Sequence, residues 1–282
     1  MKTYSVQSVD TTIAAEQIQF GLWRLMTVEK RLALSRATTR RCRQMALSGI
    51  KERNGELSSQ LLKKEFVRAT LGEEYLDIPQ LWEVELMTED PIWLAAKIGQ
   101  ILHTLSIPYF VGGSIASSTH GEPRSTQDAD IAIALLEDRA EALIEVMERE
   151  FYISEVAVAD ALSGRLPTFN VIHLATSIKA DLYLLRPDNE YEQIQLQRRQ
   201  LMSLPGDSDL TFYLCSPEDI VLQKLMWYKI AINQSEKQWR DILGVLKLQG
   251  DSRLDFVYLW HWAERLGVFE DIDRALSEAG LH

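Results

Sequence analysis

The segment 107–135 restricts the fold more than any other part of this chain. An apolar run, Ile107–Val111, ends at Gly112-Gly113-Ser114, and a second apolar run begins with Asp128-Ala129-Asp130. Two glycines directly after an apolar run allow a tight turn and a close approach of the backbone to a ligand. We therefore predict a strand, a turn, a short helix from Ser114, and a second strand with two carboxylates at its start.

Helical spacing of apolar residues dominates both ends of the chain, whereas short apolar runs are confined to its middle. The sequence therefore predicts an α+β fold with a mixed β-sheet core over 89–205. A helical N-terminal region (1–88) and a helical C-terminal region (206–282) flank this core.

Capping residues predict where several helices begin. Asp90 before Pro91 and Ser216 before Pro217 are typical helix starts, and Ser235 with Gln238 forms a capping-box pattern. Either Ser58 or Ser59 caps another helix. The other elements that we predict are helices at 28–50, 137–150, 254–266 and 269–279, and strands near 151–158, 168–174 and 179–185.

Charge is unevenly distributed along the chain. The net charge of −11 comes entirely from the residues after 90, while the segment from Arg24 to Arg68 holds 12 basic and 4 acidic residues. Two interpretations remain open for this basic segment: contact with RNA phosphates, or a solvated helix face. The residues concerned are Arg36, Arg40, Arg41, Arg43, Lys51 and Arg53.

Composition excludes several classes of protein. No apolar run approaches the roughly 20 residues that a membrane span needs, and the first thirty residues do not resemble a secretory signal. Only two cysteines are present, so neither a disulfide framework nor a cysteine zinc site is supported. We expect a cytoplasmic protein that does not associate with membranes.

Three acidic residues interrupt apolar strands. Asp128 and Asp130 are two residues apart, so they point to the same face of a strand, and Asp181 interrupts the apolar run Ile178–Leu185. If the two strands are neighbours, three carboxylates converge. Such a group suits Mg²⁺, which prefers oxygen ligands, and in particular a two-ion site for phosphoryl displacement. Ser114 at a helix start would favour phosphate nearby.

Gly-Gly-Ser, a spacer of 13 residues and Asp-Ala-Asp resemble the signature of the DNA polymerase β-type nucleotidyltransferase superfamily over about residues 95–185. The resemblance implies transfer of a nucleoside monophosphate from an NTP to a hydroxyl or phosphate acceptor. It also implies that Gly112, Gly113 and Ser114 bind the nucleotide phosphates, and that Asp128 and Asp130 bind metal with Asp181 as the third carboxylate.

The segments 214–225 and 239–242 are similar to the helical half of abortive-infection-type toxin nucleotidyltransferases and of related bacterial proteins. This resemblance implies that Lys224 and Asp241 face the active site, although the spacing around Asp219 is one residue off the toxin pattern. The implied acceptor is tRNA or another RNA in the toxin-like branch and a small molecule in others. The alternative is an inactive relative that binds nucleic acid or protein.

Other residues near the motif have two interpretations each. Arg124 lies in the loop leading to the acids and is a candidate to hold a phosphate, and Lys179 either offsets the acids or reaches the phosphates. We expect His120 to be a loop contact and Asp219 to be part of a helix cap. Trp227, Trp239, Trp260 and Trp262 fall at helical spacings, which is typical of core residues rather than of base-stacking groups.

Overall fold

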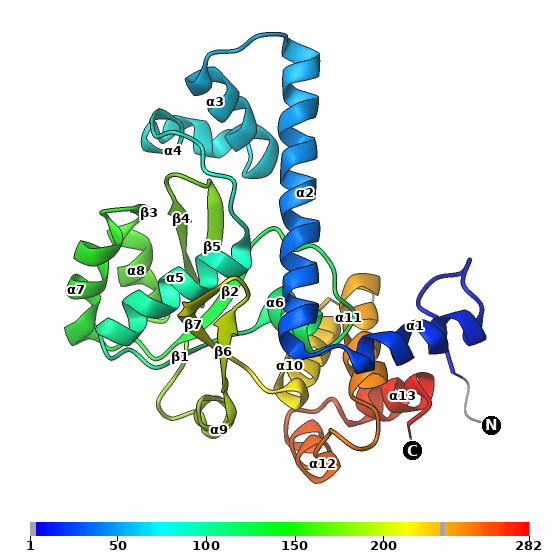
Figure 1. The fold of residues 1–282 in the computed structure, drawn as a ribbon. Coiled ribbons are helices and arrows are strands. Elements are labelled where there is room, and N and C mark those ends of the chain that lie inside the picture. The colour runs from blue at the N-terminus through cyan, green and yellow to red at the C-terminus, as the bar shows by residue number, and fades with distance from the viewer. Residues whose placement is uncertain (1–3, 232–234, 282) are drawn as a thin grey trace.

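A seven-stranded mixed sheet forms the centre of the computed structural model, which describes residues 4–231 and 235–281 (Figure 1). The strand order is β3-β4-β5-β2-β1-β7-β6. β2 is parallel to β5 and β1 is parallel to β7, while the other neighbours are antiparallel. The strands are β1 (Tyr109–Val111), β2 (Ala129–Ile133), β3 (Phe151–Ile153), β4 (Thr168–His173), β5 (Ile178–Leu184), β6 (Gln200–Leu204) and β7 (Asp207–Leu214).

Helices account for the rest of the regular structure, so the predicted α+β fold is confirmed. None of the helices in the part of the chain that the structure describes is long and apolar enough to cross a membrane. The helices are α1 (Ile13–Leu25), α2 (Val28–Asn54), α3 (Ser59–Thr70), η1 (Glu73–Asp77), α4 (Gln80–Glu83), α5 (Pro91–Thr104), α6 (Gly113–His120), α7 (Glu137–Met147), α8 (Glu155–Leu162), α9 (Glu190–Arg198), α10 (Pro217–Ile230), α11 (Glu236–Gln249), α12 (Phe256–Arg265) and α13 (Phe269–Ala279).

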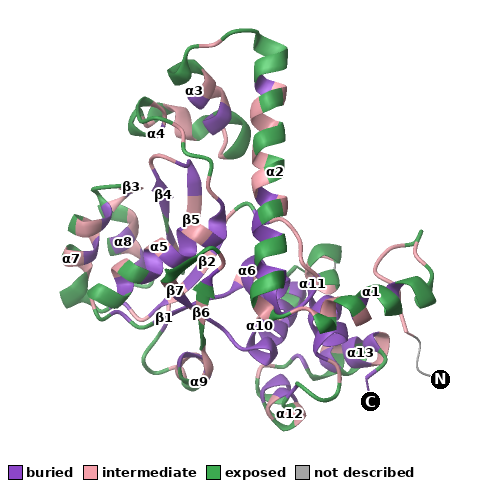
Figure 2. Ribbon diagram, in the orientation of Figure 1, coloured by how far each residue is buried: buried purple, intermediate pink, exposed green. Residues whose placement is uncertain are grey.

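One part of the main hydrophobic core lies between a face of the sheet and α5. Alternate residues of a strand point to opposite faces, and Ile131 of β2 and its register partner Leu182 of β5 are both fully buried on the face that α5 covers. The Asp90 carboxylate begins α5 by accepting hydrogen bonds from two backbone N–H groups of the first turn. Figure 2 shows buried residues in the sheet and in α5, and also in α10 and α11.

The opposite face of the sheet carries the polar residues of the same strands. The N-terminal helices cover one end of this face, where Ile172 of β4 packs against Val67 of α3 and Leu81 of α4. α10 and α11 pack against α6 at the other side. The face between these two helical groups includes Asp130 and Asp181.

α2 is tightly attached to the core along much of its length. Its residue Leu32 belongs to the main hydrophobic cluster, and the Arg31 guanidinium donates a buried hydrogen bond of 3.0 Å to the carbonyl of Thr119 in α6. This long helix contacts α6 near its beginning and α3 near its end (Figure 1). Removing the N-terminal region would therefore expose the core.

Two predictions of local structure were wrong. The strand predicted over 151–158 ends at Ile153, because the Ser154 side chain accepts a hydrogen bond from the Ala157 N–H and begins α8. The sequence also gave no prediction for the β6–β7 hairpin, in which Pro205 and Gly206 form the turn. Ser58 rather than Ser59 caps α3.

Candidate functional site

The turn after β1 and the start of α6 form the first part of the candidate site. Gly113 has φ +53, and a β-carbon at this position would overlap the Asp130 carboxylate, so only glycine fits. The Ser114 N–H donates to the Asp130 carboxylate. The Ser114 hydroxyl is buried and bonds the Thr126 hydroxyl, which in turn contacts the Asp128 carbonyl at 3.1 Å. The turn is thus built around the acidic strand.

The second part of the site is the pair of parallel strands β2 and β5. Asp130 and Asp181 are register partners on these strands, so their side chains lie on the same face of the sheet. Asp128 lies just before β2, and its charge acts on both of the other acids. The pairing of β2 with β5, which the sequence left open, therefore brings Asp181 beside Asp130 and near Asp128.

Electrostatics at this region favour the uncharged acid forms. Burial, with the charges of Asp128 and Asp181, raises the pKa of Asp130 to about 6, although Lys224 acts in the opposite direction. Burial also raises the pKa of Asp181, even though the Lys179 ammonium lies 3.0 Å from its Oδ2. The pKa of Lys179 is raised too, because its contact with Asp181 outweighs burial.

The donor chemistry of the three acids fits a hard divalent cation such as Mg²⁺. Among residues 4–231 and 235–281, however, no three His, Cys, Asp or Glu side chains lie close enough together to hold one ion as they are placed. The Asp181 carboxylate is instead paired with the Lys179 ammonium.

The third part of the site comes from the C-terminal helices. Lys224 of α10 lies 2.9 Å from the Asp241 carboxylate of α11, and Arg124 donates two hydrogen bonds to the same carboxylate, of 2.9 and 2.7 Å. Burial raises the pKa of Asp241, but the hydrogen bonds and charges of Arg124 and Lys224 outweigh it and lower the pKa overall. Both cations are thus already paired with Asp241.

Two residues near the motif have structural roles, as expected. His120 is buried and bonds the Cys215 carbonyl at 2.8 Å, and burial lowers the pKa of His120 to about 4. Asp219 is buried and forms the helix cap of α10 with Ser216, and it also accepts a hydrogen bond of 2.6 Å from the Tyr258 hydroxyl. In the part of the chain that the structure describes, the hydrogen bonds of both residues go to groups other than the three acids.

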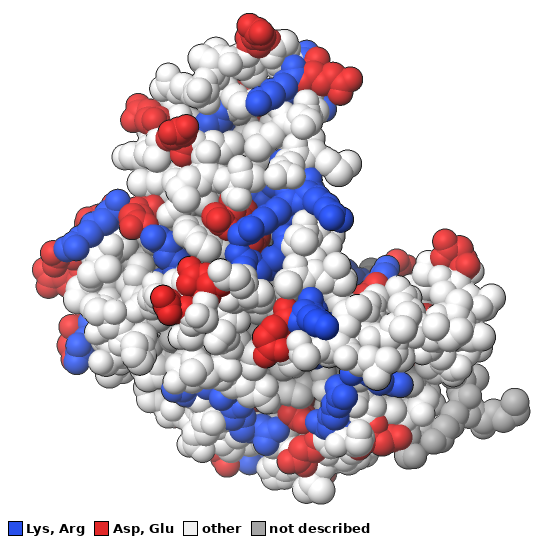
Figure 3. Space-filling view, in the orientation of Figure 1, with Lys and Arg blue, Asp and Glu red and all other residues white. Residues whose placement is uncertain are grey.

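Several residues of the basic segment make contacts within the protein. Arg36 and Arg40 of α2 pair with Asp90 at 3.0 and 2.9 Å, and Arg43 donates to the Thr176 carbonyl. These three arginines attach α2 to the core. Both interpretations from sequence were wrong for Arg36, which is buried, whereas Arg40 and Arg43 are partly exposed. Arg41, Lys51 and Arg53 are exposed. Figure 3 shows basic and acidic side chains mixed on this face.

Two residues beside the acids, Asn170 and Tyr183, were not predicted from the sequence, and Trp227 lies next to Tyr183. Asn170 of β4 is the register partner of Asp181 and is exposed. The Tyr183 hydroxyl lies 3.5 Å from Asp130 Oδ1. Trp227 of α10 is 48% exposed and contacts the Tyr183 ring, so the core interpretation of Trp227 was wrong. Alternation along β5 could have indicated Tyr183, because Tyr183 and Asp181 are two residues apart.

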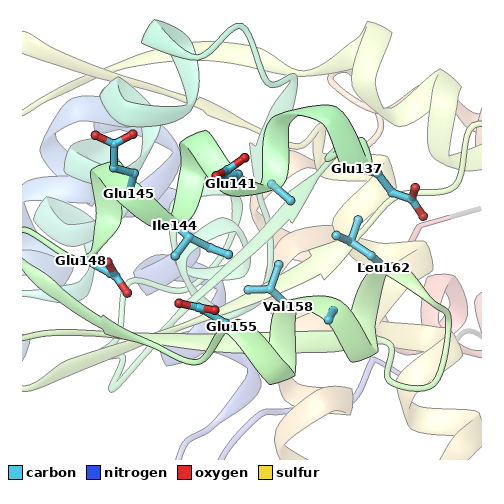
Figure 4. Close-up of a pocket in the computed structure, with 10 residues that line it drawn as sticks. Glu137, Glu141, Ile144, Glu145, Glu148, Glu155, Val158 and Leu162 are labelled. Carbon is cyan, nitrogen blue, oxygen red and sulfur yellow. The ribbon is translucent and has the colours of Figure 1, made fainter.

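A separate groove of about 550 Å³ lies between α7 and α8. Figure 4 shows its apolar floor, which includes Ile144, Val158 and Leu162, and the glutamates around it. None of the candidate site residues lines this groove. It is therefore distinct from the acidic site.

Comparison with known proteins gives structural likenesses only. No protein-family model matches the sequence, and no curated protein does. An antigenic nucleotidyltransferase-like protein from Paracoccidioides brasiliensis is similar over 68% of this chain and 94% of its own, with 21% identity and a TM-score of 0.44.

Two structures of ANT(2″)-Ia are also similar. One, in complex with adenylyl-2″-tobramycin, covers 65% of this chain and 97% of its own with 15% identity and a TM-score of 0.40. The other, a solution structure, covers 64% and 98% with 11% identity and a TM-score of 0.37. These values are low, so the function of this chain has to be argued from its own residues.

Proposed function

We propose that this protein is a metal-dependent nucleotidyltransferase, which transfers a nucleoside monophosphate from an NTP to a hydroxyl or phosphate of an acceptor. The observation that carries the proposal is the register of Asp130 and Asp181 on adjacent parallel strands, directly beside the Gly113–Ser114 turn. Buried carboxylates on one face are costly unless a cation offsets them.

Each group of residues has a role in this proposal. The backbone of Gly112, Gly113 and Ser114 holds phosphate oxygens at the start of α6. Asp128, Asp130 and Asp181 would hold Mg²⁺. Bound ions would neutralise these acids and stabilise the charge on the reacting phosphate.

Side chains around the acids position the triphosphate. Lys179 and Lys224 supply positive charge, and Arg124 does so as well once a phosphate competes with Asp241 for it. The acceptor oxygen attacks the α-phosphorus, pyrophosphate leaves, and Asp181 accepts the proton of the acceptor hydroxyl. The acceptor enters between the sheet and the C-terminal helices, since ligand sites favour such boundaries.

RNA, including tRNA in a toxin-like role, is the acceptor class that we propose. Arg41, Lys51 and Arg53 remain exposed on α2, and phosphate contacts of this kind dominate RNA affinity. Because α2 is part of the core, a charge reversal of these three residues tests the idea better than deletion of 1–88. We expect the triple glutamate variant to fold normally and to lose RNA binding.

The experiment that tests the proposed function combines binding and transfer. Wild-type protein is mixed with each NTP, with and without Mg²⁺, and thermal unfolding is recorded, because a ligand that binds the folded state raises its apparent stability. Transfer of label from an α-labelled NTP to bulk tRNA is measured in parallel. Asp130→Asn should abolish Mg²⁺-dependent NTP stabilisation, and its persistence in this variant would contradict the proposal.

A second candidate function is a catalytically inactive binding module for nucleic acid or protein. It is favoured by one observation: Asp181 is paired with Lys179, and Asp241 is paired with both Lys224 and Arg124. In this alternative the charges are internal ion pairs. Variants of Asp128 and Asp130 would then retain partner binding, and no NTP would stabilise the wild type.

A further inference from the structure

Trp227 differs from the other tryptophans of the C-terminal helices. Trp262 is buried and Trp239 and Trp260 pack against the core, but the Trp227 side chain is 48% exposed. It lies three residues after Lys224 on α10, and residues three apart share a side of a helix. A large aromatic ring is therefore presented to solvent on the side of α10 that carries Lys224.

Tyr183 connects Trp227 to the acids. The two ring centroids are 6.4 Å apart with an angle of 69° between the planes, which is an edge-to-face contact. The Tyr183 hydroxyl lies 3.5 Å from Asp130 Oδ1. A line of contacts thus runs from the proposed metal carboxylate through Tyr183 to Trp227.

We propose that Trp227 binds the base of the NTP by stacking, with Tyr183 holding its ring in place. This inference rests on the proposed function, and it identifies the surface for the part of the substrate that the phosphate turn does not contact. The edge-to-face contact fixes the indole ring while nearly half of its side chain remains accessible. An exposed, fixed ring suits a planar ligand.

Stacking of this kind predicts a substrate class. Every nucleobase has a π-face, so an aromatic ring can stack on any of the four bases, and such stacking contributes about 1–3 kcal/mol per base to the binding free energy. We therefore expect the enzyme to bind all four NTPs with similar affinity. Removal of the Trp227 ring should weaken NTP affinity by about 5- to 150-fold, which is this stacking energy converted to a ratio of dissociation constants.

The test compares wild type with Trp227→Ala, Trp227→Phe and Trp260→Phe. Affinities for ATP, GTP, CTP and UTP are measured with Mg²⁺ by thermal shift and by tryptophan fluorescence. Inorganic tripolyphosphate, which lacks a base, is the matched probe. Trp227→Ala should weaken all four NTPs but not tripolyphosphate, and Trp227→Phe should retain most of the affinity. The NTP-dependent fluorescence change should vanish in Trp227→Phe and persist in Trp260→Phe.

The other outcomes would contradict either the stacking surface or the proposed function. Equal NTP affinity in wild type and Trp227→Ala would overturn the stacking surface and leave the proposed function intact. Equal loss for NTPs and tripolyphosphate would also overturn it, because the effect would not depend on the base. If no NTP binds to the wild type, the proposed function itself fails.

Discussion

Gly113 and Asp130 pack so closely that a β-carbon at Gly113 would lie 2.7 Å from the β-carbon of Asp130 and would overlap its carboxylate. The contact fixes the Gly112–Ser114 turn against the acidic strand β2. Position 113 also has φ +53. Glycine is therefore required there by the backbone conformation as well as by the lack of room for a β-carbon. The turn and the acids therefore form one unit.

Replacement of Gly113 by alanine should be far more destabilising than the conformational cost alone. A left-handed alanine costs about 1–2 kcal/mol, and the displaced carboxylate adds to this. The matched control is Gly164→Ala, whose φ is +75 and whose β-carbon would meet nothing within 4 Å. Denaturant unfolding of both variants measures the difference. Equal losses would show that the Asp130 contact has no energetic effect.

Asp130 should make stability fall as pH rises. Its pKa is raised to about 6 by burial and by Asp128 and Asp181, above the unfolded value of about 3.9. The folded state therefore binds the proton more tightly, so this contribution is full below pH 4 and is lost as pH rises through 6.

Asp130→Asn should remove this dependence. At pH 7.5 it should raise the free energy of unfolding by about 1–3 kcal/mol, which corresponds to an unfolding temperature a few degrees higher. Thermal unfolding from pH 4.5 to 8 without divalent ions is the measurement. Identical pH profiles of variant and wild type would disprove the assignment of this shift to Asp130.

Asp241 should be essential for stability because it neutralises two cations. Asp241→Asn keeps the shape of the side chain but leaves the buried Lys224 without a carboxylate partner. Breaking a buried ion pair in this way should lower the free energy of unfolding by about 3–5 kcal/mol. The control is Asp160→Asn, which breaks a pair with the exposed Arg165 and should cost less than about 1 kcal/mol. Chemical denaturation compares the two, and similar costs would argue against a buried clamp.

Arg36 and Arg41 should separate the structural and surface roles of α2. Arg36→Ala removes a buried partner of the fully buried Asp90 and should cost about 2–4 kcal/mol. Arg41 is exposed, so Arg41→Ala should change the free energy of unfolding by less than about 0.5 kcal/mol. If Arg41→Ala is the more damaging variant in denaturant unfolding, our description of α2 is wrong.

Local sequence signals were sufficient where the cause of structure is local. The caps at Asp90 and Ser216 were predicted, because a side chain and the N–H groups it accepts from lie within one turn. The turn at Gly112 and Gly113 after β1 follows from local sequence in the same way, whereas Asp128 lies just before β2 rather than within it. The strand predicted through residue 158 failed because a Ser154 cap competes with weak strand periodicity.

The sequence by itself determined that this chain has an acidic strand after a glycine turn, flanked by helices. Only the tertiary structure decided that β5 lies next to β2 and so aligns Asp181 with Asp130. It also decided that Arg36 pairs with Asp90, that Arg124 and Lys224 share Asp241, and that Trp227 remains exposed. The physical reason is that these contacts join residues far apart in the chain, and periodicity and capping carry no information about which distant elements will pack together.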